Sequence, residues 1–357
     1  MEANEGADGE ALEVAAADAR MPSDPQSPAP PRAPYFDQSA GAWVLSRYAE
    51  VTAAFREARL WPIGQRGDDQ FAVRDETGRL RVRGDLLDSI SPARLAEWQP
   101  AMEELADSSA ARLPRDRPVD LLGEYAKPWS LALAMLVTGA DAADRERLAE
   151  LGSRVYAGTG QPQDSPLRTA ATEAAAQLER LFDAQVARLG EPTLVGVSQT
   201  MPRLLANGWL ALLRHPEQWA LLRDRPELMP LAIEELFRYA SIVPALFRRA
   251  VEDVELGELR IRAGERVNLM VGSANRDPDQ FPEPNRLDVT RRFTAHVTLG
   301  MGRNSCVGAI LIRMAAGTTT GALLRRFGGA QLSGTVEWLT GSGFCWPAAV
   351  YAMAAGV

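Results

Sequence analysis

The sequence predicts a mainly α protein of the α+β class, and two observations support this prediction. Apolar residues recur at the spacing of amphipathic helices over most of the chain after residue 35. Short strand-like stretches are concentrated in the C-terminal half. The chain has 357 residues, of which 46% are hydrophobic, so it is long enough to bury a large core. We therefore expect one domain over residues 35–357.

The first elements are mostly helical. Residues 43–58 predict a strand that runs into a helix, and residues 91–113 carry apolar residues at helical spacing behind a Ser-Pro start. The alanine-rich stretch 165–190 predicts one long helix that ends at Gly190 as a glycine cap. Residues 200–224 are more apolar still and predict a core helix that turns at a His-Pro pair.

After a further helix over residues 230–240, the pattern changes to strands. Residues 253–271 resemble hairpins hinged at Gly257 and Gly264. No internal repeat is evident. Helix therefore dominates, with a modest β region in the C-terminal half.

Residues 1–34 differ in composition from the rest. They contain seven acidic residues and two arginines, a net charge of -5 out of the chain's -8. The segment is rich in proline and lacks apolar periodicity, so we expect a disordered, solvated leader. An interaction arm is the alternative.

Composition also excludes several classes of protein. The remaining net charge of -3 makes nucleic acid an unlikely partner. No run of eighteen apolar residues is present. Two cysteines without paired spacing, Cys306 and Cys345, fit a reducing compartment. We expect a soluble, cytoplasmic protein with no membrane partner. Lys127 is the only lysine in the sequence.

Cys306 lies in a glycine-rich loop, LGMGRNSCVG, just before an apolar stretch that predicts a helix from near Val307. At a helix N-terminus, unpaired backbone N–H groups favour thiolate over thiol. Gly300, Gly302 and Gly308 would let the backbone lie against a bulky, flat group. These residues alone leave two interpretations open: a thiolate ligand beneath a planar cofactor, or a buried cysteine among turn glycines.

Other chemistries for this thiol are poorly supported. A cysteine nucleophile needs a histidine base, and neither His215 nor His296 is well placed. Zinc needs several Cys or His ligands at characteristic spacing, which the chain does not offer. Ser305 replaces the third glycine of a nucleotide-binding loop.

The same stretch resembles the haem-binding loop of the cytochrome P-450 monooxygenases, whose pattern is Phe-Gly-x-Gly-x-His/Arg-x-Cys-x-Gly. A second family signature, Glu-x-x-Arg, is present as Glu235 and Arg238, and its usual arginine partner matches Arg286 in FPEPNRLDV. These signatures occur in the family's order, so the resemblance extends from about Tyr35 to the C-terminus.

The resemblance implies a helix-rich triangular prism with a small β region and a haem between the distal helix and the cysteine loop. The haem would be heme b (iron protoporphyrin IX), with Cys306 as the iron ligand. A thiolate ligand favours cleavage of the O–O bond. Glu235, Arg238 and Arg286 would form a buried charged network under the haem, in which every charge must be paired.

The haem propionates need cationic partners. Arg79 and Arg83 match the basic pair of a family helix, and Arg248 matches an arginine before a β segment. Asn304 occupies the family's His/Arg position, so one expected donor is neutral. The alternative for the arginine-rich run around Arg79 is a solvated face.

The distal helix departs from the family most. Its Ala/Gly-Gly-x-Asp/Glu-Thr pattern becomes Gly196, Val197, Ser198, Gln199 and Thr200. The resemblance implies that the Thr200 alcohol supports proton delivery, whereas Gln199 cannot ionise. Val197 fills a glycine position, and Pro202 would release a helical carbonyl. The alternative is that Thr200 and Gln199 are polar residues facing solvent.

The segment before the distal helix is also shorter than in the family, by a few tens of residues. We therefore expect a more open site, or one completed by a carrier or a second subunit. The residues expected to contact substrate are mostly apolar, as in other organic-ligand pockets, although such residues are often plain core. They are Trp61, Leu194, Val195, Val197, Val243, Leu246 and Phe344.

The resemblance implies a monooxygenase that hydroxylates or epoxidises a hydrophobic small molecule, free or carrier-bound, in bacterial specialised metabolism. Electrons would come from ferredoxin and ferredoxin reductase. Two alternatives remain. The first is a haem-thiolate enzyme that couples or rearranges its substrate or uses peroxide, and the second is a catalytically silent haem protein.

Overall fold

The computed structural model describes most of the chain after residue 27. The described residues are 28–62, 76–159, 161, 165–182, 187–292, 294–341 and 344–355. Side chains of 76–82, 187–189, 191 and 341 lie outside this description. Most of the expected leader, residues 1–27, is therefore not described. Its last residues contact the domain, because the Arg32 N–H donates to Ser46 Oγ at 2.8 Å.

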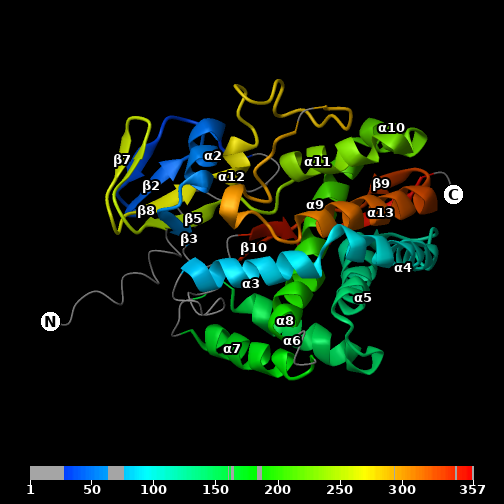
Figure 1. Ribbon diagram of the computed structural model, residues 1–357. Coiled ribbons are helices and arrows are strands. Elements are labelled where there is room, and N and C mark those ends of the chain that lie inside the picture. Colours follow the sequence, from blue (N-terminus) through cyan, green and yellow to red (C-terminus); the bar gives the residue numbers. More distant parts are fainter. Residues whose placement is uncertain are drawn as a thin grey trace.

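Helices form most of the molecule, and a sheet lies along one side (Figure 1). The distal helix crosses the centre as three consecutive segments, α8, η3 and α9. The helical elements are α2 (Tyr48–Arg56), α3 (Glu76–Ser89), α4 (Pro92–Ala111), η1 (Leu121–Ala126), α5 (Lys127–Thr138), η2 (Ala142–Asp144), α6 (Arg145–Ala157), α7 (Pro166–Glu179), α8 (Ala187–Val195), η3 (Gly196–Thr200), α9 (Met201–Arg214), α10 (Pro216–Asp224), η4 (Pro226–Leu228), α11 (Met229–Tyr239), α12 (Val271–Ala274), η5 (Gly302–Asn304) and α13 (Ala309–Phe327).

The largest sheet has the strand order β1-β2-β8-β5-β3, with β2 and β8 parallel and the other pairs antiparallel. It joins N-terminal strands to C-terminal ones, so the β region is not confined to the C-terminal half. The strands are β1 (Tyr35–Asp37), β2 (Ala42–Leu45), β3 (Leu60–Pro62), β5 (Leu246–Ala250) and β8 (Arg266–Leu269).

The remaining strands form small sheets. A three-stranded sheet has the order β4-β12-β9, and β6-β7 and β10-β11 are two-stranded. Gly257, with φ +58°, makes the β6-β7 turn as expected, but β8 leaves this hairpin after Gly264 and joins the large sheet. The strands are β4 (Val119–Asp120), β6 (Val254–Leu256), β7 (Leu259–Ile261), β9 (Ala330–Leu332), β10 (Trp338–Gly341), β11 (Phe344–Pro347) and β12 (Tyr351–Ala354).

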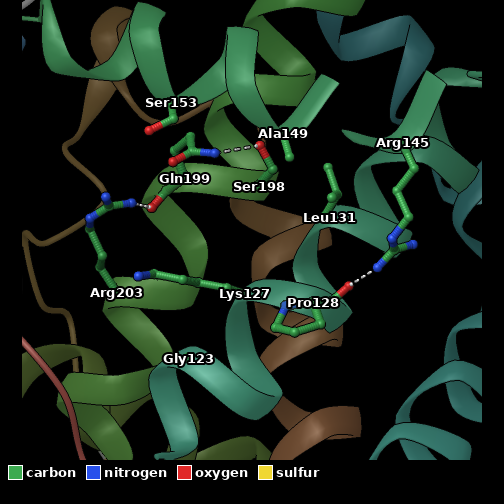
Figure 2. A pocket seen from close by; sticks show the side chains of 10 residues that line it. All are labelled: Gly123, Lys127, Pro128, Leu131, Arg145, Ala149, Ser153, Ser198, Gln199 and Arg203. Atoms are coloured by element: carbon green, nitrogen blue, oxygen red, sulfur yellow. Dashed lines mark hydrogen bonds between the residues drawn. The ribbon is translucent and has the colours of Figure 1, made fainter. Parts of the chain in front are cut away.

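The centre of the distal helix is a π-helical turn, η3, where the N–H of Met201 reaches back to the carbonyl of Gly196. Pro202 follows directly and has no N–H to donate, and a regular helix would place its ring against an earlier carbonyl. A wider π turn relieves such a clash, and such turns are frequent at functional sites. Helices α5 and α6 pack around this turn, beside a hollow (Figure 2).

Two expected helix boundaries are wrong. The predicted helix over 165–190 is divided, because α7 ends at Glu179 and Gly190 lies inside α8. A Cβ atom on Gly190 would lie 2.6 Å from the Phe182 ring, so the chain folds back here and Gly190 provides the space. Helix α13 begins at Ala309, slightly later than expected, with Gly308 as its N-cap.

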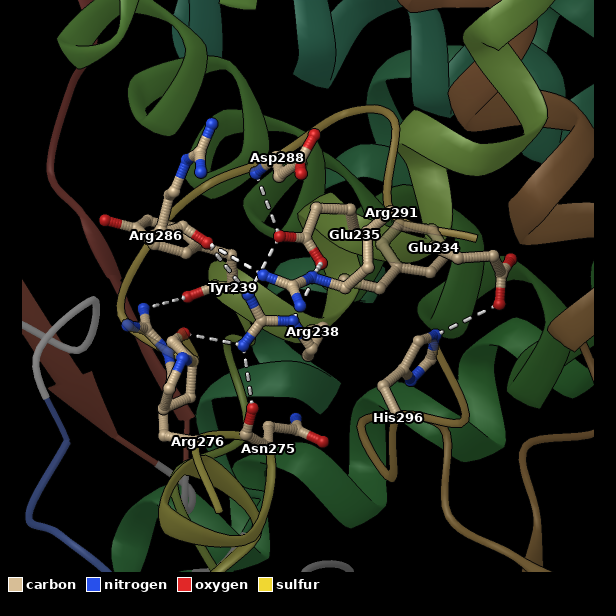
Figure 3. Close-up of polar contacts among 12 residues, drawn as sticks. Glu234, Glu235, Arg238, Tyr239, Asn275, Arg276, Arg286, Asp288, Arg291 and His296 are labelled. Carbon is tan, nitrogen blue, oxygen red and sulfur yellow. Dashed lines mark hydrogen bonds and ion pairs between the residues drawn. The ribbon is translucent and has the colours of Figure 1, made fainter. Parts of the chain in front are cut away.

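A buried ion network connects α11 to the segment that precedes the cysteine loop (Figure 3). Arg238 donates to both carboxylate oxygens of Glu235, at 2.7 and 2.8 Å, and the two side chains are fully buried. Arg238 also donates to the carbonyls of Asn275 and Pro284, at 2.9 and 2.8 Å. Because these groups lie far apart in sequence, the pair fixes the path of the loop between them.

The third member of this network is Arg291 and not Arg286. Arg291 Nε donates to Glu235 at 3.1 Å, and its side chain is 12% exposed. The Arg286 side chain is 61% exposed and pairs with Glu283, while its carbonyl accepts from Arg238 at 3.3 Å. The expected role of the Arg286 side chain is therefore wrong. Its position in the loop presents the backbone to Arg238 and leaves the side chain in solvent.

Among the described residues, no helix combines the length and apolar character needed to cross a bilayer.

Replacing Arg291 by leucine removes one of the two cations that contact the buried Glu235 carboxylate. We expect a loss of about 1.5–3 kcal/mol in unfolding free energy, since a charged hydrogen bond is lost. The matched variant Arg286→Leu removes an exposed pair and should cost less than about 1 kcal/mol. Denaturant unfolding followed by tryptophan fluorescence measures both, and equal losses would contradict this assignment.

Candidate functional site

The Cys306 loop is a tight backbone turn that leaves its thiol half-buried. The Cys306 N–H donates to the Leu299 carbonyl at 2.7 Å, which closes the loop. Gly300 and Gly302 have φ values of +68° and +63°, a region that favours glycine. By contrast, Cys345 is completely buried in β11. The two thiols therefore differ in their surroundings: Cys306 lies in a loop that its own N–H closes, whereas Cys345 lies in a buried strand.

The glycines of this loop also allow close approach. A Cβ atom on Gly302 would lie 3.3 Å from the Phe55 carbonyl at the end of α2. A Cβ atom on Gly308 would lie 4.0 Å from Cys306 Sγ. A side chain at 308 would thus lie in contact with the sulfur, which glycine avoids. The sulfur also lies two residues before the N-cap of α13, where backbone N–H groups favour a thiolate.

Two of the expected propionate partners lie near this loop: Arg83 contacts it directly, and Arg248 contacts Phe55, which lies beside Gly300 and Gly302. Arg83 in α3 donates to the carbonyl and hydroxyl of Ser305, at 2.6 and 2.9 Å. Arg248 in β5 is buried, with its guanidinium carbon 5.5 Å from the centre of the Phe55 ring. The Arg79 side chain lies outside the described residues. Asn304 is half-buried, and its carbonyl lies 3.3 Å from the Cβ position of Gly300.

These observations fit a haem. A half-buried sulfur, glycines that permit close approach, and the cationic side chains of Arg83 and Arg248 near the loop suit a thiolate-ligated, doubly anionic macrocycle.

A second carboxylate, Glu234, supports the loop and was not anticipated from the sequence. Arg313 in α13 donates to both of its oxygens, at 2.6 and 3.0 Å, and the buried His296 lies 3.3 Å away. Burial opposes ionisation, but the adjacent His296 ring and the Arg313 guanidinium lower the pKa of Glu234 to about 2. Glu234 thus ties together the two segments that flank Cys306. The only sequence signal was its position beside Glu235.

The distal turn carries Thr200 and Gln199, both half-buried. Gln199 faces the hollow between α5 and α6, where its amide donates to Ser198 Oγ at 3.3 Å (Figure 2). Arg203, one turn later, donates to the Gln199 carbonyl. The Arg203 side chain therefore connects the first turn of α9 to the distal turn.

The expected substrate residues divide into two groups. Leu194 and Val195 have no exposed surface, so both pack in the core of this structure. The Leu194 side chain lies 3.9 Å from the Cβ position of Gly152 in α6. Contact of these two residues with substrate stays a prediction.

The other expected substrate residues keep some accessible surface. Val197 and Val243 are 6% and 8% exposed, whereas Leu246, Trp61 and Phe344 are half-buried. Phe344 stacks against Tyr156, with ring centroids 6.2 Å apart. Val197 lies in the distal turn, Trp61 and Leu246 in the large sheet, and Phe344 in β11. Val243 lies in the loop between α11 and β5.

Comparison with known proteins supports one family. The sequence model of the cytochrome P-450 family matches residues 216–344, a range that includes the Glu235 network and Cys306. The vitamin D(3) 25-hydroxylase of Pseudonocardia autotrophica is 33% identical over 79% of this chain and 79% of its own length.

Solved structures agree. The LnmA cytochrome P-450 hydroxylase of the leinamycin pathway of Streptomyces atroolivaceus superposes with a TM-score of 0.76 at 29% identity, covering 87% of this chain and 90% of its own. CxnD, a cytochrome P-450 for C–S bond formation in chuangxinmycin biosynthesis, superposes with a TM-score of 0.74 at 26% identity, covering 87% and 88%. With the cysteine loop, the buried Glu235–Arg238 pair and these similarities, the chain belongs to the cytochrome P-450 family of monooxygenases.

Proposed function

We propose that this protein is a haem-thiolate monooxygenase that hydroxylates or epoxidises a hydrophobic small molecule in bacterial specialised metabolism. The observation that carries this proposal is the geometry of Cys306, half-buried in a glycine loop beside Arg83 and Arg248. Membership of the family and similarity to hydroxylases such as LnmA support the reaction type.

Heme b is the proposed cofactor, held by the Cys306 thiolate, with Arg79, Arg83 and Arg248 as partners of its propionates. Gly300, Gly302 and Gly308 provide close approach, and Asn304 offers a neutral contact. When bound, the haem supplies an iron whose thiolate ligand favours O–O bond cleavage. Proton delivery and substrate positioning are the proposed roles of the protein's own side chains.

Thr200 is the proposed proton-delivering residue, because its hydroxyl both donates and accepts a hydrogen bond. Gln199 cannot ionise, so it orients water or substrate and does not supply a proton. The side chains of Trp61, Val197, Val243, Leu246 and Phe344 exclude water from an apolar substrate and position it.

The remaining assignments extend the resemblance to bacterial members. Electrons come from a ferredoxin and its reductase, the protein acts in the cytoplasm, and residues 35–357 form one haem domain. The substrate is free or attached to a carrier, since the segment before the distal helix is short.

A second candidate is a haem-thiolate enzyme that couples or rearranges its substrate or uses peroxide. The neutral Gln199 lies inside a π turn that is followed by Pro202 in α9, which favours this candidate, as does similarity to CxnD, which is named for C–S bond formation. A silent haem protein is less well supported, because the cysteine loop is intact.

Cys306→Ser should abolish the far-red-shifted Soret band of the reduced carbon monoxide complex, since only a thiolate ligand produces it. Cys345→Ser should leave that band intact because Cys345 is buried away from the loop. Absorbance difference spectra of the purified variants measure both, and the opposite pattern would end the assignment.

Arg83→Leu and Arg248→Leu should each weaken haem retention, because a propionate loses a charged hydrogen bond of about 1.5–3 kcal/mol. Haem loss to apomyoglobin should accelerate about tenfold or more. Arg94→Leu, which breaks an exposed pair with Glu97, is the matched control. Unchanged rates in both variants would assign these arginines to purely structural contacts.

Thr200→Ala should divert electrons into hydrogen peroxide, because the hydroxyl that positions a proton at the reaction site is lost. Substrate binding, read as a spin-state change in a compound panel, should survive. Gln199→Glu should keep or improve product per electron, since a positioned acid–base group contributes about 10²–10⁴-fold. If Thr200→Ala leaves product per electron unchanged, or peroxide alone supports equal turnover, the second candidate is favoured.

A further inference from the structure

A hollow of about 430 Å³ lies beside the distal turn, between α5 and α6 (Figure 2). Its polar lining comes from Lys127, Arg145, Ser153, Ser198, Gln199 and Arg203. The other described lining residues carry no charge. Three cationic side chains therefore share one hollow, and none of its described lining residues is acidic.

These cations are not neutralised by the described part of the protein. Arg145 donates to the Pro128 carbonyl at 3.0 Å, and Arg203 donates to the Gln199 carbonyl, so both contact neutral backbone. The Arg203 guanidinium carbon also packs on two aromatic rings, 4.1 Å from the centroid of Tyr156 and 4.9 Å from that of Trp346. Its Nε is buried and has no hydrogen-bond partner among the described residues. An unsatisfied buried donor of this kind carries a desolvation cost.

The charges also act on one another. Desolvation, followed by the positive charge of Arg203, lowers the pKa of Lys127, and the Asp120 carboxylate only partly opposes this shift. Asp120 is itself engaged, because its oxygen accepts from the N–H groups of Leu122 and Val350. Like charges held together without an acid are unfavourable unless an anion joins them.

We propose that this hollow binds a small organic molecule through a carboxylate or phosphate group. Lys127 supplies a point charge, whereas Arg145 and Arg203 supply planar donors that match an oxyanion. Ser153 and Ser198 add neutral hydrogen-bonding groups. The volume exceeds that of a simple ion and lies within the range of organic-ligand pockets. A bound anion would lie beside Gln199 and hold the distal turn through Arg203. The lining of this hollow includes Gln199 but neither the Cys306 loop nor the proposed propionate partners Arg83 and Arg248, so the proposal goes beyond the proposed monooxygenase activity.

Lys127 allows a direct test because it is the only lysine in the chain. Its side chain is exposed at the hollow, so reductive methylation with ¹³C-formaldehyde labels this amine and the N-terminus. The haem-loaded, labelled protein is titrated with inorganic phosphate and, separately, with succinate, with sodium chloride holding ionic strength constant. We expect a saturable shift of the Lys127 methyl signal and a rise in the amine pKa. The stronger probe identifies the anionic group.

Arg145→Gln should weaken the binding of that probe about tenfold, since one charged contact is lost. Arg147→Gln is the matched control, because Arg147 is an exposed arginine on the same helix but outside the hollow. Both substitutions change exposed side chains, so folding should be preserved. No saturable shift with either probe, or equal weakening by the two substitutions, would overturn the proposal. Neither result bears on the carbon monoxide spectrum, so the haem assignment is tested independently.

Discussion

The buried ion pair between Glu235 and Arg238 is the interaction on which the rest of the site depends. Both side chains are fully buried, so removing either would leave an unpaired charge in the core, typically at a cost of about 3–5 kcal/mol. Arg238 uses its remaining donors on loop carbonyls, and Asn275 continues the connection by accepting from the Val297 N–H at 2.8 Å. The cysteine loop begins two residues later.

A parallel connection runs through the neighbouring carboxylate. Glu234 pairs with His296 before the loop and with Arg313 after it. Adjacent acids on α11 therefore hold different segments. Glu235, through Arg238 and Arg291, holds the chain that leads to the cysteine loop, and Glu234 holds the segments on both sides of that loop. Because of this double attachment, the Cys306 thiol is presented by rigid elements, as a metal ligand requires.

On the distal side, the constraint is backbone geometry. Gly196–Thr200 form a π turn, and Pro202 follows without an N–H. Arg203 donates to the carbonyl of Gln199, which links the turn to the cationic hollow and to Tyr156, the ring that stacks on Phe344. The neutral Gln199 thus lies in a hollow whose charged lining residues are all cations. A bound anion would therefore neutralise the cations of this hollow.

Local spacing in the sequence determined the helix-rich class, the Cys306 loop and the Glu235–Arg238 pair, because each depends on residues within one turn or one loop. Distant contacts were decided only by the tertiary structure. Arg291 and not Arg286 pairs with Glu235, since a loop backbone sets which side chain points inward. Leu194 and Val195 are core residues, because neighbouring helices cover them, and the 165–190 helix breaks where Phe182 packs on Gly190. Lys127, Arg145 and Arg203 are far apart in sequence, and only the packing of α5, α6 and α9 brings their charges together.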